Sequence, residues 1–371
     1  MNVRVRFLIN SLAGGGAERV MVTLLAASQA RMAASPFALA LLDDDPDAYP
    51  PPAWLPVARL STGGSLVRGV SAMLSLVQRE RPTLILAFLT RSNIIAVIVA
   101  KLTRRRVIIS ERVNTTAHLA GSRVARLLVR ATYPRADRII AVSEGVADDL
   151  VKNFGVARDR IVAIANPVDI DTIIARGREF VAPPVENGFI VGMGRLTETK
   201  NMMLLVEAYA AAAISLPLVI LGEGPERAVI AARIAALGIA DRVHLLGFQP
   251  NPFAILAQAS LYVSASNGEG FPNALVEAMA LGVPVIATNC ASGPSEILGD
   301  LPRHAVQDTM VTSWGTLVPV NDVQKLGIAI HEALEAPERI TAQGIAGQMR
   351  AQEYSVDRAV EHYWNIIDQI R

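Results

Sequence analysis

The segment from Ser266 to Glu296, SNGEGFPNALVEAMALGVPVIATNCASGPSE, constrains the fold of this 371-residue chain more than any other part of it. Its glycines, asparagines and proline predict a loop, and the residues that follow predict a helix over Ala274–Leu281 and a buried strand over Val283–Thr288. Because proline is tolerated only near a helix start, we expect the helix to begin beside Pro272, with Asn273 as its capping residue. A loop followed by the free N–H groups of a helix start favours an anion, most often a phosphate.

Two carboxylates lie eight residues apart in this segment, Glu269 in the loop and Glu277 in the helix. With the embedded G-F-P, the E-A-M-A and the following G-V-P-V-I, they resemble the E-x7-E signature of the retaining nucleotide-sugar glycosyltransferases of family four, which have the two-domain GT-B fold. The resemblance implies that Glu269 contacts hydroxyl groups of the donor sugar and that Glu277 holds the ribose of the nucleotide. The alternative, a pair of solvated carboxylates, fits the glycine context less well.

Length and composition limit the fold class. A chain of 371 residues is long for one hydrophobic core, so two domains are expected. No run of about 18 apolar residues is free of charge and proline, so we predict no transmembrane span. Arg4 and Arg6 alternate with apolar residues, which indicates a first strand and not a signal peptide. The single cysteine, Cys290, excludes an internal disulfide, fits a reducing cytosol and is expected to be a small buried residue.

The charge is divided unevenly along the chain. Residues 1–168 contain 22 Lys and Arg against 12 Asp and Glu, whereas the remainder contains 13 against 22. A basic half can bind nucleic acid, an anionic membrane or a phosphorylated substrate, or it can be ordinary surface charge. Arginines at 123, 126 and 130 follow helical spacing, and four further cations lie at 101 and 104–106. This helix either rests on an anionic bilayer or packs its apolar face on the sheet.

A glycine run, Gly14–Gly16, separates the predicted strand Val3–Ile9 from a helix that continues to Ala27. Such a run lets the backbone approach a ligand at the carboxyl edge of a parallel sheet, although it matches neither G-x-G-x-x-G nor a Walker loop. In the family that the chain resembles, the equivalent loop faces the donor phosphates and the acceptor. Gly15 and Gly16 are therefore candidate binding residues.

The end of the strand predicted at Val107–Ser110 departs from the family pattern. Many relatives carry a histidine there that reaches the donor sugar, whereas this chain has Glu111 and Arg112, with His118 several residues later. We predict that Glu111 faces the acceptor or the donor sugar and that His118 belongs to a helix start. Which of the two is the catalytic group stays open.

The second half carries a phosphate-binding pattern. The sequence GRLTETKN follows the predicted strand Phe189–Met193 and resembles the family's G-R-L…K-N element. Without a metal, a departing phosphate needs positive charge from Arg or Lys, and no D-x-D triplet or ligand cluster indicates a divalent cation. Arg195 and Lys200 are therefore assigned to the pyrophosphate, the alternative being a surface ion pair with Glu198. Further along, Phe248 either stacks on the nucleotide base or belongs to the core.

The predicted fold is α/β of the GT-B type, with two Rossmann-like domains facing across a cleft and a C-terminal helix, Val356–Ile370, that crosses back to the first domain. The acceptor-binding domain is predicted at residues 1–168 with 355–371, the linker at 169–188 and the donor-binding domain at 189–354. Tyr363 and Trp364 are expected to anchor the last helix.

The resemblance implies metal-independent, retaining transfer of a hexose or N-acetylhexosamine from a nucleotide-diphospho-sugar to a sugar acceptor. The expected acceptor is a lipid-diphosphate-linked glycan in cell-surface polysaccharide synthesis. A UDP-sugar is favoured and GDP-mannose is possible as donor. The alternatives are a UDP-N-acetylglucosamine 2-epimerase of the same fold and a non-catalytic sugar-nucleotide-binding protein. No cofactor, metal or nucleic-acid partner is predicted. The protein is expected in the cytoplasm, free or peripheral on the inner face of the plasma membrane.

The predicted site residues fall into two groups. The catalytic group consists of Glu111, Arg195, Lys200 and Glu269. The nucleotide-sugar-binding group consists of Gly15, Gly16, Gly194, Phe248, Gly270, Phe271, Asn273, Ala274, Leu275 and Glu277.

Overall fold

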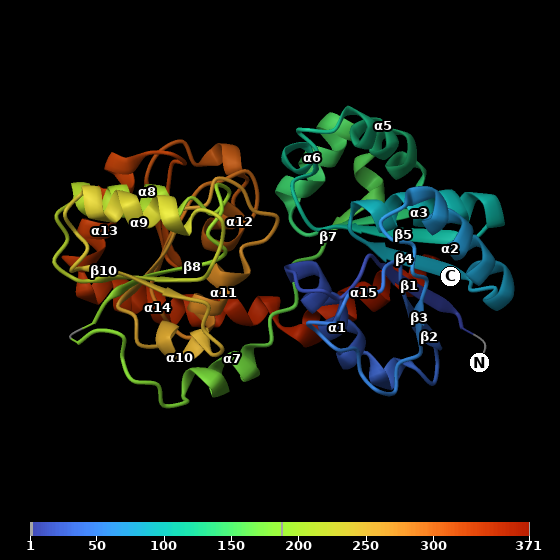
Figure 1. Ribbon diagram of the computed structural model, residues 1–371, viewed down its shortest axis with the longest axis horizontal. Helices are drawn as coiled ribbons and strands as arrows, with labels where there is room; N and C mark the ends of the chain where they lie inside the picture. Colours follow the sequence, from blue (N-terminus) through green and yellow to red (C-terminus); the bar gives the residue numbers. More distant parts are fainter. Residues whose placement is uncertain (1–2, 187, 371) are drawn as a thin grey trace. The chain divides into compact units, whose positions relative to one another are not determined.

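The computed structural model describes residues 3–186 and 188–370, so Asn187 of the predicted linker lies outside the described residues. The chain divides into two compact units (Figure 1). Unit 1 contains the residues up to Pro167 together with those from Val356 onward, and unit 2 contains Val168–Ser355. Among the described residues, no helix combines the length and apolar character needed to cross a membrane.

Unit 1 is built on a sheet of seven parallel strands in the order β3-β2-β1-β4-β5-β6-β7. Helices cover both faces of this sheet, which explains why β2 and β4 are entirely apolar and buried. The short, partly exposed strand β3 was not predicted. The strands are β1 (Val5–Ile9), β2 (Phe37–Leu41), β3 (Val57–Arg59), β4 (Leu84–Phe88), β5 (Arg106–Glu111), β6 (Arg138–Ala141) and β7 (Ile161–Ala163).

The last helix of the chain belongs to unit 1, as predicted, and packs against the first helix. Its Tyr363 and Trp364 are buried, and the indole N–H of Trp364 donates to Ser28 Oγ at 2.8 Å. The other helices cover the opposite face (Figure 1). The helices of unit 1 are α1 (Gly16–Ala27), α2 (Leu66–Glu80), α3 (Thr90–Thr103), α4 (Thr115–His118), α5 (Arg123–Thr132), α6 (Glu144–Phe154) and α15 (Val356–Ile370), with 3-10 turns η1 (Gln29–Arg31), η2 (Tyr133–Arg135) and η3 (Arg158–Arg160).

Unit 2 repeats this architecture with the strand order β10-β9-β8-β11-β12-β14-β13, in which only β13 is antiparallel to its neighbour. The short strands β11 and β13 were not predicted. The strands are β8 (Ile190–Met193), β9 (Leu218–Leu221), β10 (Val243–Gly247), β11 (Leu261–Ser264), β12 (Val285–Thr288), β13 (Met310–Thr312) and β14 (Gly315–Val318).

The helices of unit 2 pack on both faces of its sheet, with α8, α9 and α13 on one face and α10, α11 and α14 on the other (Figure 1). They are α7 (Ile170–Gly177), α8 (Met202–Ala211), α9 (Arg227–Ala236), α10 (Pro252–Leu256), α11 (Asn273–Ala280), α12 (Pro294–Gly299), α13 (Val323–Leu334) and α14 (Pro337–Ala351), with 3-10 turns η4 (Arg303–Ala305) and η5 (Gln352–Tyr354).

Two local expectations were wrong. Part of the segment predicted as linker is helix α7, which packs on α10 and α11 within unit 2. Asn273 does not cap α11 but is its first residue, and Pro272 occupies the cap position without a side-chain hydrogen bond. Proline is suited to a helix start because its φ is fixed and it has no N–H to leave unpaired.

Each sheet has one point at which the direction of strand order reverses. In unit 1 the chain moves from β1 outward to β3 and then returns to β4, on the other side of β1. In unit 2 it moves from β8 outward to β10 and returns to β11, on the other side of β8. In open parallel sheets, ligands bind at the carboxyl ends of the strands beside such a switch point. The β1/β4 and β8/β11 pairs therefore mark the places to look for sites.

Candidate functional site

An ion pair bridges the two loops at the switch point of unit 2. Lys200 follows β8, Glu269 follows β11, and Lys200 Nζ lies 2.5 Å from Glu269 Oε1. The carboxylate is largely buried, with 9% of its side chain exposed, whereas the lysine is 27% exposed. These residues were assigned to one substrate from separate sequence motifs, and the structure brings them together.

Polar neighbours hold the Glu269 carboxylate in place. Ser266 Oγ donates to the same oxygen, Oε1, at 2.6 Å, and the hydroxyl of Ser292 donates to the backbone carbonyl of Glu269. Among the described residues, the second oxygen, Oε2, has no recorded hydrogen bond. Glu269 can therefore accept a hydrogen bond from a ligand hydroxyl while Lys200 neutralises its charge.

Glu277 lies close to Glu269 although it comes from the helix. It is 5% exposed in α11, which follows the loop that carries Glu269. Burial raises the pKa of Tyr262, and the negative charges of Glu269 and Glu277 raise it further. Cys290, buried as predicted, shows the same effect: burial and Glu269 raise the pKa of its thiol to about 12. The negative charges of both glutamates therefore reach Tyr262 in the buried strand β11.

The start of α11 contributes backbone groups and not side chains. Phe271 is 7% exposed and packs its ring edge-on against Tyr354 at 5.3 Å, and Leu275 is fully buried in the core. Asn273 and Ala274 are partly exposed at the first turn. Gly270, Phe271, Ala274 and Leu275 can therefore meet a ligand through the peptide groups of the loop and helix start, where the helix dipole favours an anion.

Close contact between loops explains two glycines beside this site. A Cβ on Gly222, after β9, would lie 1.9 Å from the carbonyl oxygen of Gly194, and a Cβ on Gly224 would lie 2.3 Å from that of Leu196. Both distances are shorter than any real contact. The loop that carries Gly194, Arg195 and Lys200 therefore packs against the loop after β9 so closely that only glycine fits at positions 222 and 224.

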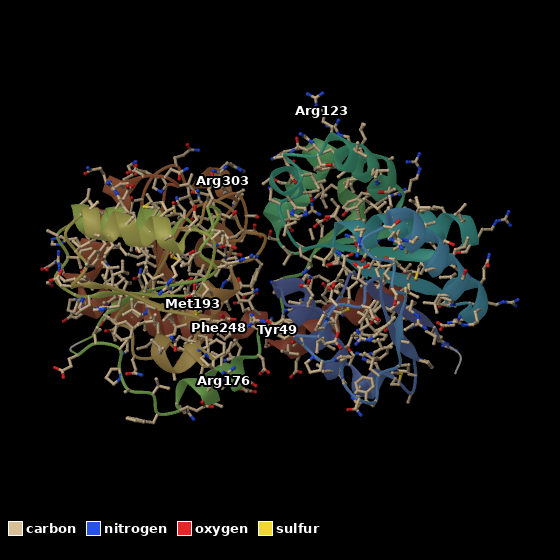
Figure 2. The ribbon with its side chains drawn as sticks, viewed as in Figure 1. Tyr49, Arg123, Arg176, Met193, Phe248 and Arg303 are labelled. Carbon is tan, nitrogen blue, oxygen red and sulfur yellow. The ribbon has the colours of Figure 1, made fainter. Side chains whose placement is uncertain are left out.

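Arg195 and Phe248 are both exposed. Arg195 makes no recorded ion pair with Glu198 or any other described residue, so the ion-pair alternative was wrong for it; the ion pair of Lys200 is with Glu269. Phe248 is 76% exposed after β10 (Figure 2), which excludes the core alternative. An exposed cation and an exposed aromatic ring are available to a ligand from the loops after β8 and β10.

Side-chain amides complete the structure of these loops, and their role was not predicted from the sequence. Asn201 caps α8 and donates from Nδ2 to Asn267 Oδ1 and to Asn321 Oδ1, each at 3.1 Å. The backbone N–H of Asn267 in turn donates to the Thr199 carbonyl oxygen at 2.8 Å. Both asparagines lie next to or near predicted site residues, which could have marked them as part of the site. Their hydrogen bonds could not be predicted, because the partners are far apart along the chain.

In unit 1, the glycine run lies where it was expected. Gly16 is the first residue of α1 and Gly15 is its cap, at the end of the loop that follows β1. Gly14 has a φ of 114°, a conformation that favours glycine, and a Cβ there would lie 3.3 Å from Ala48 Cβ. Gly15 and Gly16 therefore border the switch point of unit 1.

Glu111 is not placed to meet a substrate, contrary to our expectation. It is fully buried at the end of β5, where its Oε2 accepts from the Tyr133 hydroxyl at 2.5 Å and its Oε1 from the Arg112 N–H at 3.0 Å. Asn93 Nδ2 donates to the same Tyr133 oxygen at 3.1 Å. Burial raises the pKa of Glu111 to about 7 although these hydrogen bonds oppose the shift. The contacts of the Glu111 carboxylate are therefore with residues of unit 1 that hold the end of β5 in place.

The neighbouring Arg112 and His118 also differ from the family pattern. The Arg112 guanidinium is buried, donates to the Tyr363 hydroxyl at 2.6 Å and to Asn166 Oδ1, and lies over the ring of Phe88. Arg112 thus ties β5 to α15 within unit 1. His118 ends the one-turn helix α4, and does not start a helix as expected; its side chain is exposed.

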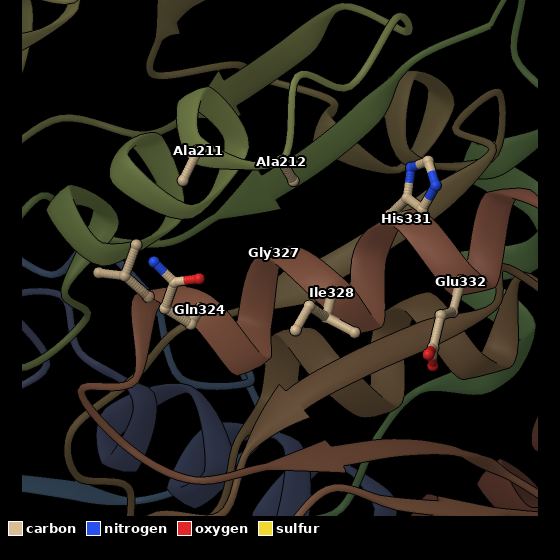
Figure 3. Close-up of a pocket in the computed structure, with 8 residues that line it drawn as sticks. Ala211, Ala212, Gln324, Gly327, Ile328, His331 and Glu332 are labelled. Atoms are coloured by element: carbon tan, nitrogen blue, oxygen red, sulfur yellow. The ribbon is translucent and has the colours of Figure 1, made fainter.

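Two hollows in unit 2 lie outside the predicted residues. One, of about 270 Å³, lies between α8 and α13 and is lined by small and apolar groups with His331 and Glu332 at one end (Figure 3). The other, of about 310 Å³, lies after β12 and β14 and is lined in part by Asn289, Arg303 and His304. In the described part of the chain, no three His, Cys, Asp or Glu side chains are grouped as metal ligands.

Comparison with known families identifies both units. Residues 14–172 match the family described as Glycosyltransferase Family 4, and residues 175–349 match the family described as Glycosyl transferases group 1. With two Rossmann-like units of this kind, the chain belongs to the glycosyltransferases of the GT-B fold.

Relatives of known name are also glycosyltransferases. The chain is 35% identical over 218 residues to the N-acetylgalactosamine-N,N'-diacetylbacillosaminyl-diphospho-undecaprenol 4-alpha-N-acetylgalactosaminyltransferase of Campylobacter jejuni, covering 57% of this chain and 59% of that one. It is 32% identical over 193 residues to the lipopolysaccharide 1,6-galactosyltransferase of Escherichia coli, covering 49% and 52%. The chain thus spans about half the length of these curated relatives.

Solved structures share the fold over nearly the whole chain. Anabaena HepE in complex with UDP gives a TM-score of 0.79 at 21% identity, covering 99% of this chain and 100% of that one. Sucrose-phosphate synthase from Thermosynechococcus elongatus gives 0.80 at 19% identity, covering 99% and 98%. At such identities the likeness shows the fold alone.

The buried Glu111 makes the stability of unit 1 depend on pH. Its pKa is raised from 4.5 to about 7, so the stabilisation is fully present below the unfolded value and is lost as the pH rises through the folded one. We expect the free energy of unfolding of the wild type, relative to Glu111→Gln, to fall by about 2 kcal/mol between about pH 5 and about pH 8.

Denaturant unfolding at several pH values measures this difference. Glu361→Gln, at an exposed position on α15, is the control and is expected to follow the wild type. A difference between Glu111→Gln and the wild type that does not change with pH would show that Glu111 is ionised in the folded protein throughout.

Proposed function

We propose that this chain is a glycosyltransferase that moves a hexose or N-acetylhexosamine from a nucleotide-diphospho-sugar, with UDP favoured, to a sugar acceptor carried by a lipid diphosphate or a growing surface glycan. The observation that carries the proposal is the Lys200–Glu269 pair at the switch point of unit 2, beside the start of α11. The names of the Campylobacter and Escherichia relatives support the acceptor class, and the UDP complex of HepE supports the donor class.

The arrangement suits a nucleotide-diphospho-sugar group by group. The diphosphate has a matching anion site in the first turn of α11, with Lys200 and Arg195 as cations from the loop after β8. Glu277 is assigned to the ribose hydroxyls, Phe248 to the base and Glu269 Oε2 to a hydroxyl of the sugar. In this proposal the ligand needs no metal, because arginine, lysine and backbone N–H groups offset the phosphate charge.

The proposed reaction retains the configuration of the donor sugar by front-face attack. The acceptor oxygen bonds to the anomeric carbon on the same face from which the bond to the diphosphate oxygen breaks, and the acceptor proton passes to that departing oxygen. Lys200 and Arg195 stabilise the charge that develops on the leaving diphosphate. Glu269 is not assigned as a nucleophile. In this proposal its Oε1 is held by Lys200 and Ser266, and its Oε2 accepts a hydrogen bond from a sugar hydroxyl.

Donor binding tests the site. Calorimetric titration with UDP-, GDP- and ADP-sugars in EDTA is expected to show binding of one nucleotide class by the wild type. Lys200→Ala and Glu277→Ala are each expected to weaken it at least about tenfold, since each removes a hydrogen bond to or from a charged group. Lys152→Ala, which removes a lysine from an exposed carboxylate pair in unit 1, is the control and should bind normally.

Binding by neither the wild type nor the variants would contradict the donor site and favour a protein that needs its acceptor first or has lost activity. Equal binding by Lys200→Ala and the wild type would place the diphosphate elsewhere. Binding of UDP-N-acetylglucosamine with its conversion to the 2-epimer in the absence of any acceptor would favour the epimerase alternative.

The stereochemistry of the product tests the mechanism. With an α-linked UDP-hexose as donor, front-face attack is expected to give an α-linked product, which proton NMR of the anomeric signal identifies. A sample in which the donor is incubated without enzyme controls for chemical breakdown. A β-linked product would mean inversion by attack from the opposite face and would overturn the mechanism, though not the donor site.

We further propose that α5 docks unit 1 on the inner face of an anionic membrane, near a lipid-linked acceptor. Val129 is buried, but Val124 and Leu127 are 68% and 64% exposed, so the apolar side chains of α5 do not all pack on the fold. Leu102, in the last turn of the adjoining α3, is 64% exposed. Arg123 projects outward from α5 (Figure 2). Exposed apolar residues among cations are the features that an anionic bilayer binds.

Flotation with liposomes containing anionic lipid tests this docking. The wild type is expected to float, and Arg123→Glu/Arg126→Glu and Val124→Ser/Leu127→Ser are each expected to lower the bound fraction at least about tenfold. The control reverses two exposed arginines elsewhere in unit 1, Arg68→Glu/Arg358→Glu, and should float like the wild type. Equal flotation of all four proteins would refute docking through α5.

A further inference from the structure

The switch point of unit 1 holds a polar cluster that no sequence motif predicted. Arg91 follows β4, Asn10 follows β1 and Asp43 follows β2, so three neighbouring strands each supply one residue at the carboxyl edge. Arg91 Nε donates to Asn10 Oδ1 at 3.3 Å, and its Nη2 donates to Asp43 Oδ2. The cluster occupies, in unit 1, the position that the Lys200–Glu269 pair occupies in unit 2.

Asp43 is built into the fold as a fixed carboxylate. Its Oδ1 accepts from the Thr62 hydroxyl and from the Gly64 N–H, both at 3.0 Å. Burial would raise the pKa of Asp43, but hydrogen bonds from Arg91, Gly64 and Thr62 outweigh it and hold the pKa below its usual value. Asp43 is therefore a charged acceptor that keeps Arg91 in one orientation.

The remaining edge of Arg91 is available to a ligand. Its Nη1 makes no recorded hydrogen bond among the described residues, and 22% of the side chain is exposed. The loop beside Nη1 is formed by Gly64, whose missing Cβ would lie 3.6 Å away, so no side chain from that position covers the guanidinium. Arg91 thus presents oriented donors next to an exposed part of Asp43, whose side chain is 16% exposed.

The turn that presents Arg91 is strained. Leu89, between β4 and α3, has a φ of 75° and a ψ of 146°, a backbone conformation that is rare for any residue except glycine. The turn places Thr90, Arg91 and Ser92 at the start of α3, where Ser92 Oγ donates to Asn10 Oδ1 at 2.8 Å.

We propose that this Asn10–Asp43–Arg91 cluster binds hydroxyl groups of the acceptor sugar. The inference rests on the proposed function, in which unit 2 takes the donor. The pair of Arg91 and Asp43 has no net charge, so it suits a neutral ligand better than a phosphate, which would meet the carboxylate. A fixed donor beside a fixed acceptor matches adjacent sugar hydroxyls, each of which can give one hydrogen bond and accept another.

Saturation-transfer NMR tests the proposal with the full-length chain saturated with UDP. The probes are the methyl α-glycosides of glucose, galactose, mannose, N-acetylglucosamine and N-acetylgalactosamine. At least one is expected to bind the wild type, with an affinity at least about tenfold weaker for Arg91→Met and Asp43→Asn. Arg91→Lys is expected to recover part of the binding, because a lysine keeps the charge but not the fork of donors.

A matched arginine–aspartate pair provides the control. Arg59, at the end of β3, lies 2.5 Å from Asp47 and is two strands from the switch point, so Arg59→Met should leave glycoside binding unchanged. UDP affinity, measured by calorimetry, should stay within about twofold of the wild type in every variant. Thermal unfolding of each variant shows whether the fold is intact.

Each outcome decides the question. No glycoside binding by the UDP-bound wild type, or equal binding by Arg91→Met and the wild type, would overturn the acceptor cluster while leaving the donor site standing. A loss of UDP affinity in Arg91→Met would overturn it as well, because the cluster would then serve the donor. If the wild type binds no nucleotide, that result contradicts the proposed function itself, and the calorimetric measurement distinguishes it from a failure of the acceptor cluster alone.

Discussion

The parallel pairing of the strands is the constraint on which the rest of the structure depends. It brings every strand's carboxyl end to one edge of its sheet, and the reversal of strand order separates the loops beside β1/β4 and β8/β11. Residues far apart in sequence meet at those two places. Lys200 and Glu269 are 69 residues apart, and Asp43 and Arg91 are 48 apart. Both units therefore place polar residues at the switch point of their sheet, but the residues and their chemistry differ.

The difference in chemistry follows from the groups that each cluster presents. In unit 2, the exposed Arg195 and Lys200 come from a loop of the same switch point as the first turn of α11, whose backbone N–H groups and helix dipole favour an anion. In unit 1, Arg91 is paired with Asp43. An exposed cation with backbone donors suits a diphosphate, and a charge-matched pair suits hydroxyl groups. The buried Glu111, by contrast, is enclosed by Tyr133 and the backbone of Arg112, where a substrate has no access.

Much of the fold could be predicted from the sequence, because long elements have clear periodicity. The bounds of α15 agree with the predicted range to the residue, and its Tyr363 and Trp364 are buried as expected. Short elements such as β3 and β11 were missed because three or four residues carry little pattern. In the site, motif spacing placed Lys200 and Glu269 correctly in loops. It could not predict that they pair, that Glu111 is buried or that Arg91 meets Asp43, since these facts depend on tertiary contacts.

The central claim is that the switch point of unit 2 takes the nucleotide and that of unit 1 takes the sugar acceptor. A crystal structure of the chain with UDP tests it most directly. The account predicts density for the diphosphate at Lys200 and the first turn of α11, with the ribose at Glu277. Density for the nucleotide at Asn10, Asp43 and Arg91, with the Lys200–Glu269 pair undisturbed and unoccupied, would contradict the account.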